Sequence, residues 1–217
     1  MAAVTTERDV GAGVHTRETV EFARVVNLSD AVFAIAMTLL VLGIEVPDVP
    51  AERLGAELAS LAPRIAVFFL AFALVANVWW QHHKLFARLA ATDRTLVALD
   101  LALLGVVALV PFPTGLLGRH PTNRAAVLLF VAAFVALLAL FLALVGHAQR
   151  AQRWRRPPPP GLFRWVVAGY LVTIAAMLGA GLAAWGSPTA GLVVLATSNL
   201  PELALARRAP AGYRDWS

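Results

Sequence analysis

Polar and charged residues interrupt an otherwise apolar stretch near the start of the chain, residues 24–46 (RVVNLSDAVFAIAMTLLVLGIEV). Arg24, Ser29 and Asp30 lie at its beginning, and Thr38 lies near its middle. An ionisable side chain at membrane depth is costly unless it is paired, so each such residue is a candidate for a structural or functional role. Arg24 can extend its guanidinium toward water, whereas Asp30 lies deeper and requires hydrogen-bond donors.

Donors for Asp30 are available in a later segment, NVWWQHHKLF, where Trp79, Trp80, His82 and His83 carry ring N–H groups. A second acid, Asp100, lies at a comparable depth in the next apolar stretch. We predict one buried polar network that contains these residues together with Ser29. Two interpretations stay open: the network holds the helices together without a direct role, or it takes part in ion or proton movement.

Thr38 lies on one stripe of a helix with Ile35 and Leu42, because the spacing i, i+3, i+7 returns to the same face about once per turn. If several copies of this helix met around an axis, the stripe would line a narrow path with rings of apolar side chains and hydroxyls. Hydrophobic rings can close such a path by excluding water, and hydroxyl oxygens can contact a partly dehydrated cation. The alternative is that Thr38 bonds its own backbone and that the two apolar residues face lipid.

No motif of an enzyme or of a metal site accompanies these residues. The sequence contains no nucleophile elbow, phosphate-binding loop or zinc-protease motif, and it contains no cysteine. The adjacent histidines at positions 82 and 83 point to different helix faces, which is unsuitable for joint metal binding. We therefore expect a protein that is not an enzyme and that needs no cofactor.

The elements that position these residues are predicted to be membrane-spanning helices. Of the 217 residues, 59% are hydrophobic, and the mean hydropathy of +0.73 exceeds that of ordinary soluble domains. Apolar runs of about eighteen or more residues recur, and each is long enough to cross a bilayer as a helix. The last run is the weakest, because it is short and contains Pro201. The predicted spans are residues 23–45, 62–83, 95–117, 124–147, 162–184 and 187–206.

Basic residues collect on one side of this predicted topology. With both termini in the cytosol, most of the arginines and the single lysine fall in cytosolic segments, as the positive-inside rule requires. This distribution accounts for most of the net charge of +5, so little remains that would indicate a nucleic-acid partner. We predict an all-α integral membrane protein with a disordered cytosolic tail at 1–19, a six-helix transmembrane domain at 20–208 and a cytosolic tail at 209–217.

The first three spans resemble a known family. Arg24, three further residues and then LSD are similar to the R-x-x-x-F-S-D signature that opens the first helix of the endosomal and lysosomal potassium channels (transmembrane protein 175), in their short bacterial branch. The segments VWWQHHKLF and DRTLVALDLALLGVVALVPFPTGLLG extend the resemblance in the expected order. The fourth to sixth spans agree with the family only in length and hydrophobicity.

The resemblance implies a six-helix subunit, four copies of which form a homotetramer around a pore lined by the first helix. It implies that Ile35 forms the constriction, that Thr38 contacts K⁺ transiently, and that Leu42 adds a further apolar ring. Potassium ions would cross the lipid bilayer passively, as in a leak channel. The polar residues would hold the first helix against the second and third. These residues are Arg24, Ser29, Asp30, Trp79, His82 and Asp100.

Two positions depart from the family pattern. Leu28 replaces the signature Phe, and Asp100 stands where an Asn is expected. Two nearby carboxylates do not both ionise readily. We therefore expect either that one of Asp30 and Asp100 is protonated or that Arg24 lies between them, and that conduction depends on pH.

The sequence thus predicts a potassium-permeable channel in the inner membrane of a bacterium. The bacterial source follows from the family branch and from the ratio of seventeen arginines to one lysine, which is typical of a GC-rich genome. A proton-coupled secondary transporter that uses the buried acids and histidines stays open as an alternative. Such carriers usually contain inverted repeats, and no internal repeat is evident here.

Overall fold

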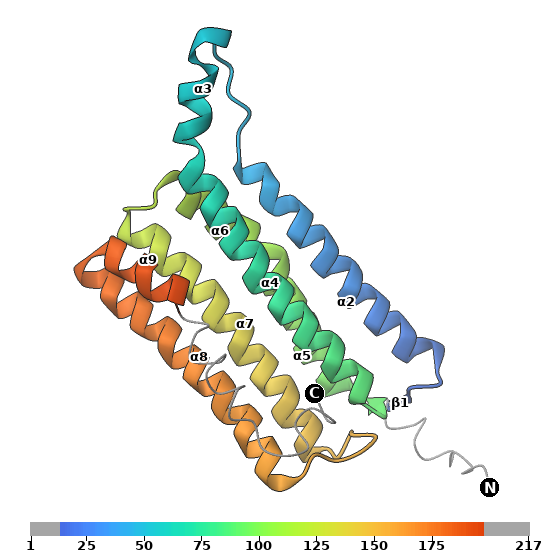
Figure 1. Cartoon of the computed structure of the whole chain (residues 1–217). Helices are drawn as coiled ribbons and strands as arrows, with labels where there is room; N and C mark the ends of the chain where they lie inside the picture. Colours follow the sequence, from blue (N-terminus) through green and yellow to red (C-terminus); the bar gives the residue numbers. More distant parts are fainter. Residues whose placement is uncertain (1–13, 198–217) are drawn as a thin grey trace, which may run out of the picture.

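The chain folds into a bundle of long helices that run side by side (Figure 1). The computed structural model describes residues 14–197. We refer to the end of the bundle that carries β1 as the β1 end and to the opposite end as the α3 end (Figure 1). The elements are β1 (His15–Thr16), α2 (Val20–Leu39), the 3-10 turn η1 (Leu40–Gly43), α3 (Ala51–Ser60), α4 (Ala62–Arg88), β2 (Ala91–Thr92), α5 (Arg94–Leu109), α6 (Pro111–Arg119), α7 (Arg124–Arg150), α8 (Pro160–Gly186) and α9 (Pro188–Thr197).

Five described segments are long and apolar enough to cross a membrane, and they coincide with the first five predicted spans. The third of these is interrupted between α5 and α6, where Pro111 and Pro113 remove backbone donors from the helix. The sixth predicted span, 187–206, is described only as far as residue 197, where it forms α9. The rest of that span, including Pro201, lies outside the described residues. The five segments are Val20–Gly43, Ala62–Arg88, Arg94–Arg119, Arg124–Arg150 and Gly161–Gly186.

Residues 14–19, which precede the first span, are ordered, and this corrects part of the prediction of a disordered tail over 1–19. His15 pairs with Thr92 and Thr16 pairs with Ala91, so that β1 and β2 form an antiparallel two-stranded sheet. Arg17 donates to the carbonyl oxygens of Ala87 at 2.7 Å and of Phe86 at 3.3 Å, which lie in the last turn of α4. The prediction is therefore wrong for residues 14–19. The parts of the predicted tails at 1–13 and 209–217 lie outside the described residues.

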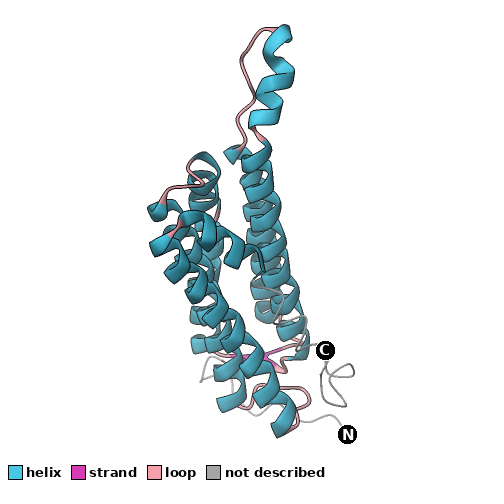
Figure 2. Cartoon of the chain, turned by 60° about the vertical axis from the view of Figure 1, so that its left-hand side comes forward, coloured by secondary structure: helices cyan, strands magenta, loops and turns pink. Residues whose placement is uncertain are grey.

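The connection between the first two spans contains a helix, α3, that the sequence analysis did not predict. It extends away from the bundle beyond the ends of the long helices (Figures 1 and 2). None of its residues is buried, and Leu54 and Leu58 expose their side chains. The subunit's core therefore does not include α3.

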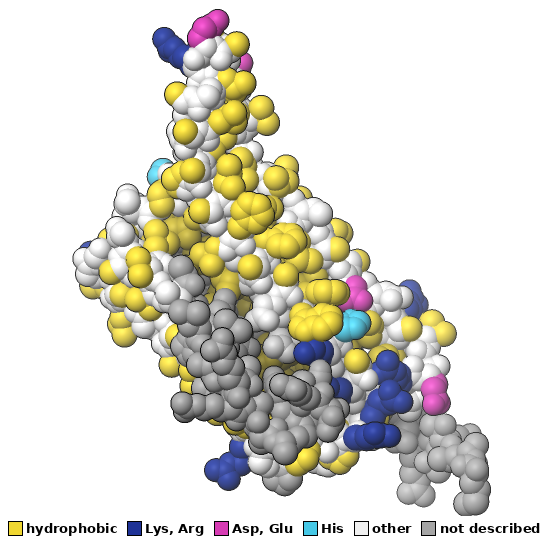
Figure 3. Space-filling view, in the orientation of Figure 1, with side chains coloured by type: hydrophobic (Ala, Val, Ile, Leu, Met, Phe, Trp, Pro, Cys, Tyr) yellow, Lys and Arg dark blue, Asp and Glu magenta, His cyan; other side chains and the backbone are white. Residues whose placement is uncertain are grey.

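The core lies along α7, which has the largest buried share of the five spans. Its aromatic residues Phe130, Phe134 and Phe141 are buried among the neighbouring helices. By contrast, α2 buries only one face, with Phe33 and Ala36 packed inward. The apolar residues on the surface cover the middle of the molecule, and Lys and Arg side chains gather toward the β1 end (Figure 3). This distribution fits a bilayer around the middle of the bundle.

The contact between α8 and α9 depends on small residues. A Cβ atom added at Gly191 would lie 2.5 Å from the Ala184 Cβ and 2.9 Å from the Ala180 carbonyl oxygen. Small residues of this kind let two membrane helices approach closely. Gly179, also on α8, has no atom within 4 Å of the corresponding position.

We expect Gly191→Ala to destabilise the protein, because the added methyl forces α9 away from α8. Overpacking of this kind costs about 1–3 kcal/mol. The midpoint of thermal unfolding in detergent should fall for Gly191→Ala and stay the same or rise for the matched control, Gly179→Ala. Equal midpoints for the two variants would contradict the close helix contact.

Candidate pore-lining helix and its polar supports

A buried carboxylate joins three helices at the centre of the predicted polar network. Asp100 of α5 accepts a hydrogen bond from the Ser29 hydroxyl of α2 at 2.8 Å. The other carboxylate oxygen lies 2.7 Å from Nε2 of His82 on α4. Asp100 and His82 are each 1% exposed, and Ser29 is fully buried. We call these three residues the Asp100 cluster; it fixes α2 against α4 and α5.

Aromatic side chains surround the Asp100 cluster. The His82 ring stacks on Phe86 with centroids 4.4 Å apart, and it lies 5.4 Å from the Phe33 ring of α2. This apolar environment excludes water from the carboxylate, so Asp100 and His82 depend on the cluster for their hydrogen bonds. The Ser29 hydroxyl also lies 2.9 Å from the Val25 carbonyl oxygen of its own helix. Removal of Asp100 would therefore leave the buried His82 unsatisfied.

Asp30 has a separate partner. The indole Nε1 of Trp79 donates to its carboxylate at 2.9 Å, which adds a second polar contact between α2 and α4. Trp79 in turn lies against Trp80 and His83. The residues predicted to form one network thus make two groups, one on Asp30 and one on Asp100.

Arg24 belongs to neither group. It is exposed on α2, and among the described residues it makes no hydrogen bond or ion pair. It lies six positions before Asp30, which corresponds to about 9 Å along the helix and to a different face. The expectation that Arg24 lies between Asp30 and Asp100 is therefore wrong. Leu28, which replaces the Phe of the family signature, is also exposed on the subunit.

The predicted stripe of Ile35, Thr38 and Leu42 faces away from the subunit. Ile35 is 57% exposed and Leu42 is 70% exposed, whereas Leu40 between them is buried. Thr38 is exposed as well, and its hydroxyl donates to the Ile35 carbonyl oxygen at 2.8 Å. The hydroxyl hydrogen is thus used within the helix, and the oxygen lone pairs stay available on the outside. Leu42 lies in η1 rather than in α2, so the stripe continues into the tighter 3-10 turn.

The end of η1 that lies toward α3 is held by residues that could not be identified from the sequence. Gly43 and Gly115 bring η1 and α6 together so closely that a Cβ on Gly43 would lie 3.3 Å from the Gly115 Cα. Next to this contact, Glu45 pairs with Arg119 of α6 and, at 3.6 Å, with Arg64 of α4. We call Glu45, Arg64 and Arg119 the Glu45 cluster. Spacing in the sequence carries no signal for this contact between distant glycines.

The comparisons with known proteins agree with this arrangement. The sequence model of the family described as endosomal/lysosomal potassium channel TMEM175 matches residues 24–111, which include most of α2, all of α4 and α5, and the Asp100 cluster. A potassium channel of Chamaesiphon minutus is 39% identical over 146 residues, which is 64% of this chain and 72% of the relative. The chain belongs to the TMEM175 family.

The TMEM175 fold extends over nearly the whole described chain. A crystal structure of a lysosomal potassium-selective channel TMEM175 homolog from Chamaesiphon minutus superposes with a TM-score of 0.73 at 29% identity, and the match covers 89% of this chain and 100% of that chain. The human endosomal/lysosomal proton channel TMEM175 is 27% identical over 144 residues, or 65% of this chain, but only 28% of the human protein is covered. These relatives are channels, which confirms the expectation that the chain is not an enzyme.

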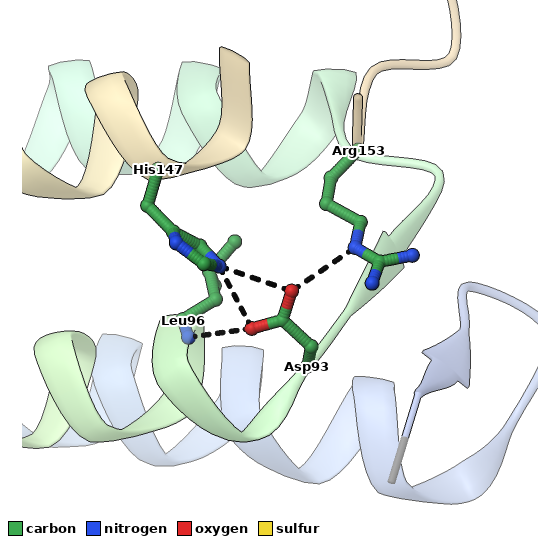
Figure 4. Close-up of polar contacts among 4 residues, drawn as sticks. All are labelled: Asp93, Leu96, His147 and Arg153. Carbon is green, nitrogen blue, oxygen red and sulfur yellow. Dashed lines mark hydrogen bonds and ion pairs between the residues drawn. The ribbon is translucent and has the colours of Figure 1, made fainter. Parts of the chain in front are cut away.

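A further polar cluster lies at the β1 end of this TMEM175 member (Figure 4). Asp93 caps α5 by accepting from the Leu96 backbone N–H at 2.9 Å. Its carboxylate also lies 2.9 and 3.0 Å from Nε2 of His147 and accepts from Nε of Arg153 at 3.0 Å. We call Asp93, His147 and Arg153 the Asp93 cluster; it joins the start of α5 to the end of α7 and the connection that follows.

Partial burial alone would raise the pKa of Asp93, but the hydrogen bonds from Leu96, His147 and Arg153 outweigh burial and lower it. The sequence carried one signal for this cluster, an Asp directly before an apolar helix, which is typical of a helix cap. The pairing with His147 is a tertiary contact between residues far apart in the chain, and local sequence does not predict it.

We expect Asp93→Asn to lower the unfolding free energy at pH 7 by about 1–3 kcal/mol, because it removes charge-assisted hydrogen bonds. The folded-state pKa of Asp93 lies below its ordinary value of 3.8. The stabilisation is therefore present above about pH 4 and disappears as the pH falls through the folded-state value. Thermal unfolding in detergent at pH 7 and at pH 3 tests this. Asp48→Asn, the same change at an exposed site, should show no such difference.

We expect Asp100→Leu to destabilise the protein by about 3–5 kcal/mol, because it leaves His82 buried without its partner, whereas the Ser29 hydroxyl can still donate to the Val25 carbonyl oxygen. Asp100→Asn should cost less, since its amide oxygen can still accept from Ser29. The double variant Asp100→Leu/His82→Phe should regain stability relative to Asp100→Leu. Unfolding midpoints in detergent give the three values. If Asp100→Leu unfolds at the wild-type temperature, the Asp100 cluster does not hold α2.

Proposed function

We propose that the chain forms a potassium-permeable cation channel of the leak type, with α2 and η1 lining the conduction path. The observation that carries this proposal is the outward position of Ile35, Thr38 and Leu42 on an element that is held near the middle of α2, at Ser29, and just beyond η1, at Glu45. Membership of the TMEM175 family and the potassium channel relatives support the choice of ion. Potassium ions would pass down their gradient without a cofactor.

The path requires several copies of the chain. One subunit encloses nothing along the stripe, because α2 packs against its own subunit by one face only. A homotetramer would place four α2 helices around a common axis, with the stripe inside. The rings at Ile35 and Leu42 would then exclude water when they are narrow, and the ring at Thr38 would offer oxygen atoms to K⁺ transiently.

The polar clusters support this path without lining it. The Asp100 cluster and the bond between Trp79 and Asp30 set the rotation of α2, so that the stripe points away from α4 and α5. The Glu45 cluster holds the other end of the same element. A rotation of α2 by one residue, about 100°, would turn Thr38 away from the path.

The charge distribution supports one orientation of the chain in a membrane. We place the protein in the inner membrane of a bacterium, with six spans and with both termini on the cytosolic side. Basic residues gather at the β1 end, which would be cytosolic under the positive-inside rule (Figure 3).

We expect purified protein in liposomes to carry potassium when a potassium gradient is clamped with a proton ionophore. Ile35→Asn should raise the potassium flux by about tenfold, which corresponds to a barrier lower by about 1.4 kcal/mol, because it makes the narrowest apolar ring polar. Thr38→Ala should reduce the preference for potassium over sodium in the same assay. Flux that neither substitution changes would argue against a path along α2.

Matched controls make the same changes off the stripe. Ile65→Asn alters an exposed residue of α4, and Thr197→Ala removes an exposed hydroxyl of α9; both should leave flux and selectivity unchanged. Flux without the ionophore would reveal proton conduction, as the name of the human relative suggests. Flux that saturates and requires a proton gradient would instead indicate a proton-coupled carrier based on Asp30, Asp100 and the histidines.

A further inference from the structure

One face of α5 is left open by the neighbouring helices. Arg94, Val97, Ala98 and Leu101 share this face, since their spacing is i, i+3, i+4, i+7. Leu101 is 51% exposed, and Arg94 and Ala98 are exposed as well. The buried residues of α5, including Asp100, lie on its other faces. The open face thus combines one cation at the end of the helix with apolar residues along it.

This face forms the floor of a groove of about 280 Å³, which we call the α5 groove. His15 of β1 contributes the remaining part of its lining. The sheet between β1 and β2 places His15 next to the start of α5, because β2 ends two residues before Arg94. The guanidinium of Arg94 and the imidazole of His15 therefore belong to the β1 end of the groove. The rest of its lining is formed by Val97, Ala98 and Leu101.

Arg94 is available for a ligand. The neighbouring acid, Asp93, already binds Leu96, His147 and Arg153. Among the described residues Arg94 makes no hydrogen bond or ion pair, although its guanidinium has five N–H donors. A guanidinium of this kind is well suited to two parallel hydrogen bonds with a phosphate group.

We propose that the α5 groove binds an anionic phospholipid. Arg94 and a ring N–H of His15 bind the phosphate, and one acyl chain lies over Val97, Ala98 and Leu101. Arg94 is the first residue of its span, so it lies at the boundary between water and bilayer. Leu101 lies about 10 Å deeper along the helix axis, at the level of the first part of an acyl chain. The small side chain of Ala98 leaves room for that chain between its larger neighbours.

Unlike a general basic surface, the α5 groove has a cation, Arg94, next to an apolar floor. Arg155 and Arg156, in the connection between α7 and α8, are exposed cations at the same end of the molecule. Neither lines the α5 groove. A bound lipid would touch both β1 and α5 and would thereby stabilise the strand pairing before the first span. This inference does not depend on ion conduction.

The test uses native mass spectrometry of the full-length protein released from detergent with phosphatidylglycerol or phosphatidylcholine of identical acyl chains. We expect the wild type to retain phosphatidylglycerol preferentially. Arg94→Gln should reduce its retention about tenfold, which corresponds to the loss of about 1.4 kcal/mol of binding. Ala98→Trp should reduce retention by filling the groove while leaving the charge in place. Arg156→Gln, the matched control, should retain phosphatidylglycerol like the wild type.

Three outcomes would overturn the proposal. Equal losses for Arg94→Gln and Arg156→Gln would show that diffuse charge attracts the lipid. Full retention by Ala98→Trp would show that no acyl chain occupies the groove. A change in the oligomeric mass of Ala98→Trp, rather than in its lipid content, would show that this face contacts a second copy of the chain. Thermal unfolding without added lipid verifies that each variant is folded.

Discussion

The buried carboxylate of Asp100 is the contact on which the position of α2 depends. It binds Ser29 of α2 and His82 of α4 while belonging to α5 itself, so three helices meet at one side chain. Packing between apolar helices in a membrane has little directional preference, because the lipid is as apolar as the helix surfaces. A hydrogen bond has both a distance and a direction. The Asp100 cluster therefore defines which face of α2 is turned inward and which is left outward.

The remaining contacts of α2 complete this constraint. The bond between Trp79 and Asp30 lies one residue from Ser29 on α2, and the close approach of Gly43 to Gly115 lies at the opposite end. Between these contacts, Phe33 and Ala36 pack inward. A helix that is fixed in rotation near its middle and at one end can keep an uncovered face at a defined position. An element with these properties is what a narrow conduction path needs, since small rotations change the side chains that meet at its centre.

The first five spans could be predicted from the sequence because long apolar runs leave few alternatives in a bilayer. Trp79 could be anticipated as a partner of Asp30, since few polar residues occur at that depth, but His82, the other donor expected there, binds Asp100 instead. Arg24 was misplaced because proximity in sequence suggested a contact that the helical turn prevents. The strand β1, the Asp93 cluster and the contact between Gly43 and Gly115 could not be predicted. Each depends on residues that are distant in the chain and that carry no periodic pattern.

The protruding helix α3 has a consequence for the evolution and the experimental use of this protein. None of its side chains is buried, and a helix of ten residues is only marginally stable by itself in water. Substitutions or insertions in α3 should change the free energy of unfolding of the subunit only slightly, so the length and composition of α3 can diverge freely between relatives. The same tolerance makes α3 a suitable place for an epitope or a protease site. Such a tag, probed in intact cells, would report the side of the membrane on which this end of the bundle lies.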